Sequence, residues 1–368
     1  MAQAPVIHVH GTVVLGDGRE VGDVWVEDGR LSLTRPSGLT ADMLRIDGVA
    51  LPGLVDVHCH VGLGADGAVP PEVAEAQAIA DRDSGVLLVR DAGSPADTRW
   101  VDDRPDLPRL LRAGRHLARP KRYIRGYGDE LSSPADLPDA VAREAARGDG
   151  WVKLVGDWID REAGDLAPLW PGDVLAAAVA RAHDEAARVT VHTFSTEAVD
   201  DLLAAGVDCI EHGTGLTADQ VRVVAERGIP VTPTLLQVGQ FEAIAAQADA
   251  RYPRFAARMR FLHARRYAQV AAFHEAGVRI LVGTDAGGTI AHGRIADECA
   301  ELVAAGVPAP AVVAAASWDA RSYLGHGELV EGASADLVVY DADPRSDIDV
   351  LRSPRAVLLR GVLREPGR

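Results

Sequence analysis

His58 and His60, two histidines separated by one residue, are the residues of this chain whose type and spacing most directly suggest chemistry. The apolar, β-branched residues 54–57 precede them and follow a Pro-Gly turn, which predicts a buried strand. Side chains alternate along a strand, so His58 and His60 point to one face and Cys59 to the other. Two imidazoles that converge at a strand end make half of a metal site. A pair of hydrogen-bonded core histidines explains the spacing equally well, so further residues must decide.

Metal-competent or activating side chains also stand where four later strands are predicted to end. They are Lys153 at strand four, His192 at strand five, His212 at strand six and Asp285 at strand eight. In a barrel of parallel strands the carboxyl ends meet at one face, so we expect all six side chains at one site. Core packing alone would not place four histidines at three strand ends.

The elements that must position these residues follow two patterns. Residues 51–324 alternate strands with helical segments such as 71–83 and 309–323, which predicts an α/β fold with a (β/α)₈ TIM barrel. Strand three is expected at residues 123–127. Residues 1–50 and 325–368 carry short β-type runs, and we expect both chain ends to form one composite β-sandwich domain. A second His-x-His pair, His8 and His10, precedes the barrel region, and we interpret it as structural.

Composition restricts the function to chemistry on small molecules. The formal charge of −16 disfavours nucleic acid and anionic membranes as partners, which require basic surfaces. No apolar run reaches the roughly 18 residues of a membrane helix, and the opening Met1-Ala2-Gln3-Ala4-Pro5 lacks the pattern of a signal peptide. The three widely spaced cysteines predict no disulfide framework, which favours the cytoplasm. We therefore expect a cytoplasmic protein with a small-molecule substrate, and its assembly into a homo-oligomer stays open.

The motifs at the predicted strand ends resemble those of the amidohydrolase superfamily of metal-dependent hydrolases, and the resemblance covers essentially the whole chain. Within that superfamily the chain is most similar to the prolidase-like and imidazolonepropionase-like members. The motifs that carry the resemblance are Pro52-Gly53-Leu54-Val55-Asp56-Val57-His58-Cys59-His60, Val152-Lys153-Leu154, Val191-His192-Thr193, Ile210-Glu211-His212-Gly213, Gly283-Thr284-Asp285-Ala286-Gly287 and Gly332-Ala333-Ser334-Ala335-Asp336-Leu337-Val338-Val339-Tyr340.

Residue chemistry assigns roles within such a site. Imidazoles and a carboxylate suit Zn²⁺, so His58, His60 and Asp285 are expected to hold one ion, and His192 with His212 a second. Lys153 is one of only two lysines among 38 basic residues, which indicates a task that arginine cannot perform. Carbamylated by CO₂, its amine becomes a carboxylate that can bridge both ions, as the resemblance implies. An ordinary ion pair at a strand end is the alternative for this lysine.

The expected reaction is hydrolysis of an amide, peptide-like or cyclic amide C–N bond by a hydroxide that bridges two zinc ions. Asp285 is the expected catalytic residue, taking the proton and returning it to the leaving amine. Glu211 and Cys59 are expected to face away from the barrel axis, in packing or supporting roles.

Substrate contacts are predicted from the loops that follow the strands. The candidates are Arg125, Tyr127, Thr234 and His292. Prolidase-like relatives often carry Gly-Gly-His-Gly after strand three, where this chain has Arg125-Gly126-Tyr127-Gly128, so the substrate of those relatives does not transfer directly.

Three other functions fit parts of the pattern. A deaminase of the same superfamily would use one metal and a glutamate three residues after the strand-five histidine, where this chain has Ser195. A mononuclear imidazolonepropionase-like hydrolase would leave Lys153 unmodified. A non-catalytic scaffold on the same fold would have lost ligands, whereas all six expected residues are present.

Overall fold

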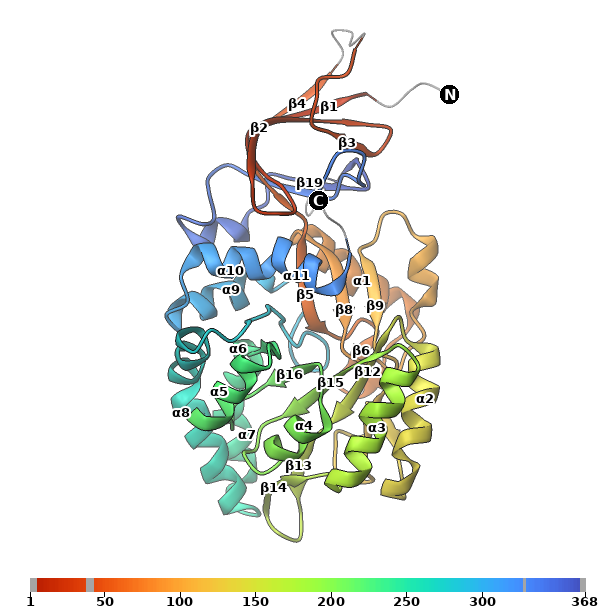
Figure 1. Ribbon diagram of the computed structural model, residues 1–368, viewed down its shortest axis with the longest axis vertical. Helices are drawn as coiled ribbons and strands as arrows, with labels where there is room; N and C mark the ends of the chain where they lie inside the picture. The colour runs from red at the N-terminus through yellow and green to blue at the C-terminus, as the bar shows by residue number, and fades with distance from the viewer. Residues whose placement is uncertain (1–4, 38–42, 327–328, 365–368) are drawn as a thin grey trace.

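The computed structural model of the protein describes residues 5–37, 43–326 and 329–364. Figure 1 shows a β-sheet at one end of the molecule and a larger body of helices and strands below it. The outermost residues of the predicted β-domain, 1–4 and 365–368, lie outside the described residues.

The sheet in Figure 1 combines strands from both ends of the described chain. Its order is β20-β19-β18-β4-β1-β2-β3, and β4 pairs in parallel with β1 and antiparallel with β18. Buried valines and leucines such as Val9, Val24 and Leu337 hold it together through one packed face. Its strands are β1 Ile7–Val14, β2 Glu20–Glu27, β3 Arg30–Ser32, β4 Leu44–Pro52, β18 Leu337–Tyr340, β19 Ala356–Leu359 and β20 Val362–Arg364.

The body contains two sheets of parallel strands. One has the order β5-β8-β9 and the other β11-β10-β12-β15-β16-β17. Their bounds are β5 Leu54–Cys59, β8 Val86–Asp91, β9 Arg109–Arg112, β10 His116–Ala118, β11 Gly128–Glu130, β12 Trp151–Val155, β15 Arg188–Thr193, β16 Cys209–His212 and β17 Val231–Thr232. Two short hairpins accompany them, β6 Leu63–Gly64 with β7 Gly67–Ala68 and β13 Asp157–Asp160 with β14 Asp165–Pro168.

Residues 280–286, where the eighth strand is predicted, connect these two sheets without forming a regular strand of their own. Ile280 bridges Val231 of β17, and Ala286 bridges Cys59 of β5. The backbone N–H of Asp285 donates to the carbonyl of His58 at 2.6 Å. The segment therefore brings Asp285 beside the end of β5, which contains His58 and leads directly into His60.

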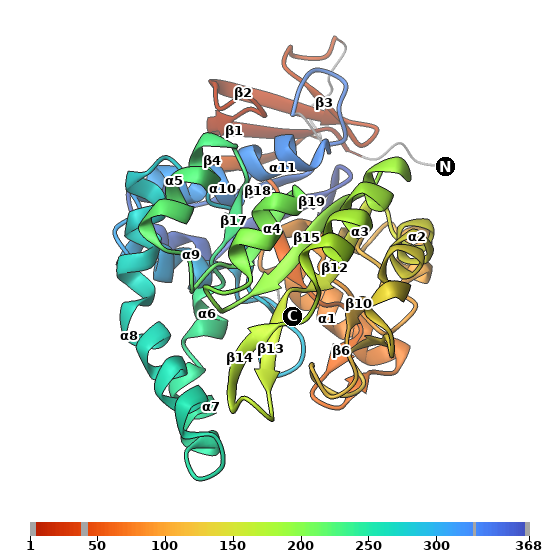
Figure 2. The same ribbon diagram turned by 60° about the horizontal axis from the view of Figure 1, so that its bottom comes forward.

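Helices pack around these strands, as Figure 2 shows. The predicted helix over residues 71–83 is confirmed, whereas the one predicted over 309–323 divides at Ser317. The Ser317 hydroxyl donates to the carbonyl of Pro52 at 2.6 Å, so the break lies against the start of β5. The helices are α1 Pro71–Asp83, α2 Leu137–Arg147, α3 Gly172–Asp184, α4 Val199–Ala205, α5 Ala218–Glu226, α6 Leu235–Val238, α7 Phe241–Ala248, α8 Pro253–Glu275, α9 Ile295–Ala304, α10 Ala309–Ala316 and α11 Trp318–Leu324, with 3₁₀ turns at Arg99–Asp103, Pro134–Asp136 and Ile348–Arg352.

The position predicted for strand three is wrong. Residues 123–127 form bends and turns. The strand that pairs in parallel with β8 is β9, in which Leu110 stands opposite Val89. Lys121 and Gly126 have φ values of 62° and 84°, which interrupt an extended strand on both sides of Tyr123. The buried pair Leu110 and Leu111 supplies the apolar surface of the strand that forms.

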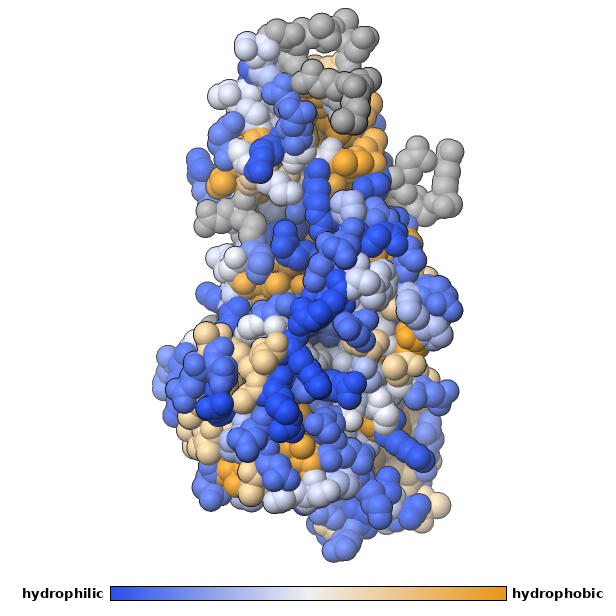
Figure 3. Space-filling view, turned by 90° about the vertical axis from the view of Figure 1, so that its right-hand side faces the viewer, coloured by the Kyte–Doolittle hydropathy of each residue, from blue (hydrophilic) through white to orange (hydrophobic). Residues whose placement is uncertain are grey.

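The chain direction sets where the strands of the body end. β5 begins two residues after β4 leaves the seven-stranded sheet, so its carboxyl end lies away from that sheet, toward the β13–β14 hairpin in Figure 1. The side of the molecule in Figure 3 is mainly hydrophilic, with small separated hydrophobic patches. Within the described residues, none of the helices combines the length and apolar character that crossing a membrane requires.

Candidate active site

A pocket at the carboxyl ends of the strands brings together five of the six expected metal ligands. His58, His60, His192, His212 and Asp285 line it. Aromatic side chains form much of the remaining wall, namely Tyr123, Tyr127, Trp158 and Phe194. Lys153 is not in the lining: it lies in the middle of β12, two residues before the strand ends, and is 1% exposed.

His58 and His60 present the same ring atom to the same carboxylate oxygen. Nε2 of His58 lies 3.1 Å, and Nε2 of His60 2.9 Å, from Oδ1 of Asp285. The other ring nitrogen of each histidine has a fixed acceptor, because Nδ1 of His60 donates to the carbonyl of Gly93 at 2.7 Å and Nδ1 of His58 to Glu211 at 2.8 Å. With the Nδ1 protons engaged, two Nε2 lone pairs face one carboxylate, an arrangement that fits a cation between them.

Glu211 determines the orientation of His58. It is fully buried and forms an ion pair with Arg90 and a hydrogen bond with Thr190. Burial alone would raise the pKa of Glu211, but the charge of Arg90 and the hydrogen bond from His58 hold it well below its usual range. The side chain is therefore a carboxylate that accepts the Nδ1 proton of His58 and supports this ligand, as the sequence predicts for a supporting residue.

His192 and His212 form the second pair. Nδ1 of His192 lies 2.9 Å from Nε2 of His212, and Nδ1 of His212 donates to the hydroxyl of Thr234 at 2.6 Å. Burial lowers the pKa of His212 to about 3 and that of His192 well below its usual value. Both rings are therefore neutral at working pH, which is the form that binds a metal ion.

Lys153 is a buried amine without a hydrogen-bond partner among the described residues. Burial lowers the pKa of its ammonium group, although Glu211 and Asp285 partly oppose this effect. Buried polar atoms normally have a partner, and a neutral amine is the form that reacts with CO₂. The environment of Lys153 therefore fits a carbamate.

The backbone at three of these positions is held in the left-handed region. His212, Thr234 and Asp285 have φ values of 65°, 48° and 57°. Residues other than glycine adopt this conformation at a cost, and they do so mainly where the surrounding structure imposes it at functional sites. These strained positions lie where the chain turns at the end of β16, after β17 and after residues 280–284. At two of them the side chain, His212 or Asp285, lines the pocket.

A buried carboxylate also fixes the chain after His192. Oδ2 of Asp157 accepts hydrogen bonds from the Thr193 hydroxyl at 2.6 Å and from the backbone N–H groups of Phe194 and Ser195 at 2.8 Å. The loop that carries Phe194 into the pocket wall is thereby anchored to β13.

Of the four predicted substrate contacts, one lines the pocket. Tyr127 lies in its wall, whereas Arg125 is exposed beside it. Thr234 is fully buried and binds His212. His292 lies outside the pocket lining, where its Nδ1 pairs with Asp81 at 2.8 Å.

Sequence reasoning missed Arg90 and His116 as neighbours of the site. His116 begins β10, and its ring centroid lies 5.0 Å from that of His60. Neither of its ring nitrogens has a partner among the described residues. Arg90 could have been recognised from the sequence, because it is a charged residue within the apolar run of β8. A buried charge requires a partner, which indicates a neighbouring carboxylate.

The family of this protein follows from a comparison with known proteins. A family model described as the amidohydrolase family matches residues 49–363, and the chain belongs to that family. It is a hydrolase that acts on carbon–nitrogen bonds, in a family that is typically metal-dependent.

The chain is also similar to particular relatives and solved structures. The chain is 54% identical over 360 residues to uncharacterized protein Rv2915c of Mycobacterium tuberculosis (strain ATCC 25618 / H37Rv), covering 98% of this chain and 96% of that protein. A putative prolidase from Bifidobacterium longum matches with a TM-score of 0.80 and 26% identity, covering 100% of this chain and 96% of that one. A Xaa-Pro dipeptidase with methionine bound in its active site matches with a TM-score of 0.82 and 23% identity, covering 98% and 100%. These structures imply the fold that contains a TIM barrel.

Proposed function

We propose that this protein hydrolyses an amide or peptide-like bond of a small substrate with two Zn²⁺ ions and a carbamylated Lys153. The observation that carries the proposal is the convergence of Nε2 of His58 and Nε2 of His60 on Oδ1 of Asp285. Similarity to a Xaa-Pro dipeptidase and to a putative prolidase favours dipeptides and N-acyl amino acids as the first substrates to examine.

The ligands divide into two groups joined by the lysine. His58, His60 and Asp285 would hold one ion, His192 and His212 the other, and the carbamate of Lys153 would bind both. When bound, divalent ions at these positions lower the pKa of a water molecule and polarise the scissile carbonyl.

The remaining steps fall to side chains of the chain itself. Asp285 takes the proton of the attacking water and returns it to the leaving nitrogen. Tyr127 lines the pocket with its hydroxyl close to Gly288, another lining residue, and is our candidate donor to the substrate carbonyl. Trp158 and Phe194 exclude water from the apolar part of the substrate.

The same proposal covers the architecture around the site. Residues 51–324 would form a closed (β/α)₈ barrel, and residues 1–50 with 325–368 a composite β-domain. The bridges of residues 280–286 to β17 and β5 support closure, and the mixed origin of the seven-stranded sheet supports the composite domain. Cys59, Cys209 and Cys299 are free buried thiols, which supports a cytoplasmic location.

Metal analysis of a His10→Ala protein, in which the histidine pair outside the pocket is disrupted, and of the same protein with Lys153→Ala tests this function. About two zinc ions per chain are expected in the pocket, falling in the Lys153→Ala variant and partly regained with bicarbonate and a short carboxylic acid. A Lys121→Ala variant is the control, because Lys121 is the other lysine and lies on an exposed turn. Hydrolysis of a panel of dipeptides, N-acyl amino acids and cyclic amides is measured in parallel.

One ion per chain with no dependence on Lys153 would contradict the bridged site. The compact group of His58, His212 and Asp285, whose ligand atoms lie within 4.8 Å of one another, favours a mononuclear cyclic amidohydrolase in that case.

A further inference from the structure

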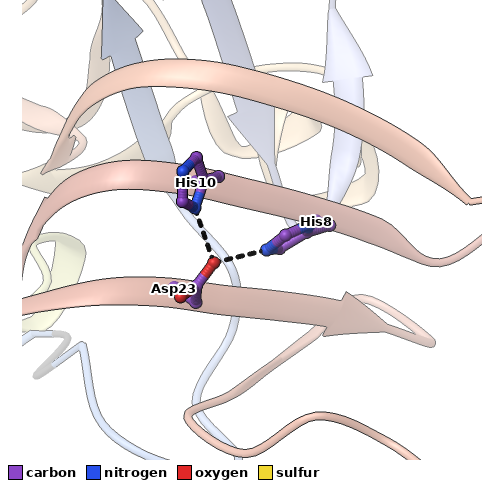
Figure 4. A group of neighbouring side chains, drawn as sticks. All are labelled: His8, His10 and Asp23. Carbon is purple, nitrogen blue, oxygen red and sulfur yellow. Dashed lines mark hydrogen bonds and ion pairs between the residues drawn. The ribbon is translucent and has the colours of Figure 1, made fainter.

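A second cluster of metal-competent side chains lies on the seven-stranded sheet. His8 and His10 of β1 and Asp23 of β2 point toward one another in Figure 4. Nε2 of His8 lies 2.7 Å, and Nδ1 of His10 2.8 Å, from the same oxygen, Oδ1 of Asp23. None of these residues contributes to the pocket described above.

The sheet holds the three side chains in place. His8 and His10 lie two positions apart on β1 and therefore share a face, and Asp23 stands directly opposite His10 on β2. The ring of His8 stacks on Trp25 with centroids 5.1 Å apart and an interplanar angle of 3°. This contact fixes the ring plane so that Nε2 points at Asp23.

The neighbouring strand does not compete for these ligands. Asp47 of β4 stands opposite His10 on its other side, but its carboxylate pairs with Arg45 at 2.7 Å. Asp23 therefore keeps Oδ1 directed at both histidine rings. Two imidazoles and one carboxylate oxygen thus face a common point on the sheet.

The donor set and its exposure suit a divalent transition metal. Nitrogen and oxygen donors of this kind bind Zn²⁺, and the three ligand atoms lie within 4.8 Å of one another. The side chains of His10 and Asp23 are 45% and 41% exposed, so an ion can enter from solvent and water can complete its coordination. His8, 11% exposed, forms the inner wall.

We propose that Nε2 of His8, Nδ1 of His10 and Oδ1 of Asp23 bind one Zn²⁺ ion that joins β1 to β2. In the sequence the histidine pair has no third ligand nearby, because Asp23 lies 15 positions after His8 and 13 after His10. The pair is therefore typical of ordinary sheet residues. Only the pairing of the two strands brings the third ligand to the site.

Zinc binding to the full-length protein tests this site. Zinc per chain is measured by elemental analysis after equilibrium dialysis against ZnCl₂, for the wild type and for His10→Ala and Asp23→Asn variants. Both replaced residues are partly exposed, and neither belongs to the proposed catalytic machinery, so hydrolase activity and circular dichroism report retained folding. His183→Ala is the matched control, since His183 forms a single exposed pair with Asp208 at 2.9 Å.

Both cluster variants should hold one zinc ion per chain fewer than the wild type. His183→Ala should hold as many as the wild type. Loss of a residue that only supports a metal ligand lowers affinity roughly 10- to 100-fold. Loss of a ligand itself, as in these variants, should lower the zinc affinity of this site by more than that. Zinc should also raise the thermal midpoint of the wild type more than that of His10→Ala. Equal zinc content and equal midpoint shifts in all four folded proteins would overturn the proposal.

Discussion

Oε2 of Glu211 lies 2.8 Å from Nδ1 of His58, although 153 positions separate the two residues in the sequence. Glu211 is also paired with Arg90, and all three side chains are almost completely buried. The result is a charged chain from Arg90 through Glu211 to His58 that ends at the pocket. Such a chain fixes the tautomer of His58 and leaves its Nε2 available to a metal ion.

Replacement of Glu211 by glutamine should weaken metal binding. The variant keeps the shape of the side chain but removes the charge that holds the Nδ1 proton, and it leaves Arg90 unpaired. We expect metal affinity to fall about 10- to 100-fold, measured by competition with a chelator. Glu185→Gln, in an exposed pair with Arg181, is the control. Unchanged affinity in Glu211→Gln would contradict the supporting role.

A methyl group at Gly288 should disturb the position of Tyr127. A Cβ atom there would lie 2.6 Å from the Tyr127 hydroxyl, so the tyrosine must move. For Gly288→Ala we expect kcat/KM to fall about 100-fold, the effect of losing one donor to the reacting carbonyl, with metal content unchanged.

A substitution at a second glycine distinguishes the effect of the Tyr127 contact from the effect of backbone strain. Gly164 has a φ of 66° against 57° at Gly288, but nothing lies within 4 Å of a Cβ placed there. Gly164→Ala should therefore lose stability without losing activity. Equal activity losses in the two variants would show that strain, and not Tyr127, is responsible.

Glu298 should make stability depend on pH. Burial raises the pKa of its carboxyl from 4.5 to about 8, although backbone N–H groups of Leu235 and Leu236 oppose the rise. The folded state therefore binds a proton that the unfolded state releases between these values. It follows that the free energy of unfolding decreases as pH rises from 4.5 to about 8 and levels off above that.

Urea unfolding at several pH values measures this dependence. The decrease should be smaller in Glu298→Gln, whose side chain does not titrate, than in the wild type. Glu301→Gln, on the same helix, should keep the wild-type slope. A slope that is the same in all three proteins would rule out Glu298 as its source.

Removal of metal should destabilise the protein. Any ligand that binds only the folded state stabilises it, by about 2.7 kcal/mol at a free concentration 100 times Kd. We expect a chelator to lower the thermal midpoint and added zinc to restore it. The measurement is best made on His10→Ala, so that the cluster on the seven-stranded sheet does not contribute. A midpoint that stays constant while metal is lost would contradict a metal-stabilised fold.

Much of the candidate site could be predicted because its residues interrupt apolar runs at strand ends. His192 follows the buried run of β15 and His212 that of β16, so local pattern alone places them at neighbouring ends. Helix α1 was equally predictable, since it begins at a proline and ends where its periodic pattern stops.

The rest depends on contacts that local pattern does not carry. Residues 123–127 have strand-like composition, yet the parallel pairing of β9 with β8 decides where the third strand forms. Glu211, the partner of Arg90, lies 121 positions away, and the sequence around either residue does not indicate this pairing. His292 follows a glycine turn after strand eight, but its pairing with Asp81 directs it into the interior.

The pairing of β4 with β18 also orders events during synthesis. Pro52 ends β4 opposite Leu337, so about 285 further residues must be synthesised before β18, the second partner of β4, is available. At roughly 5–20 residues per second this wait lasts about 15–60 s, during which one edge of β4 is open to other chains. Because β5 follows β4 directly, the late closure of this sheet also completes the anchoring of the strand that contains His58 and leads into His60.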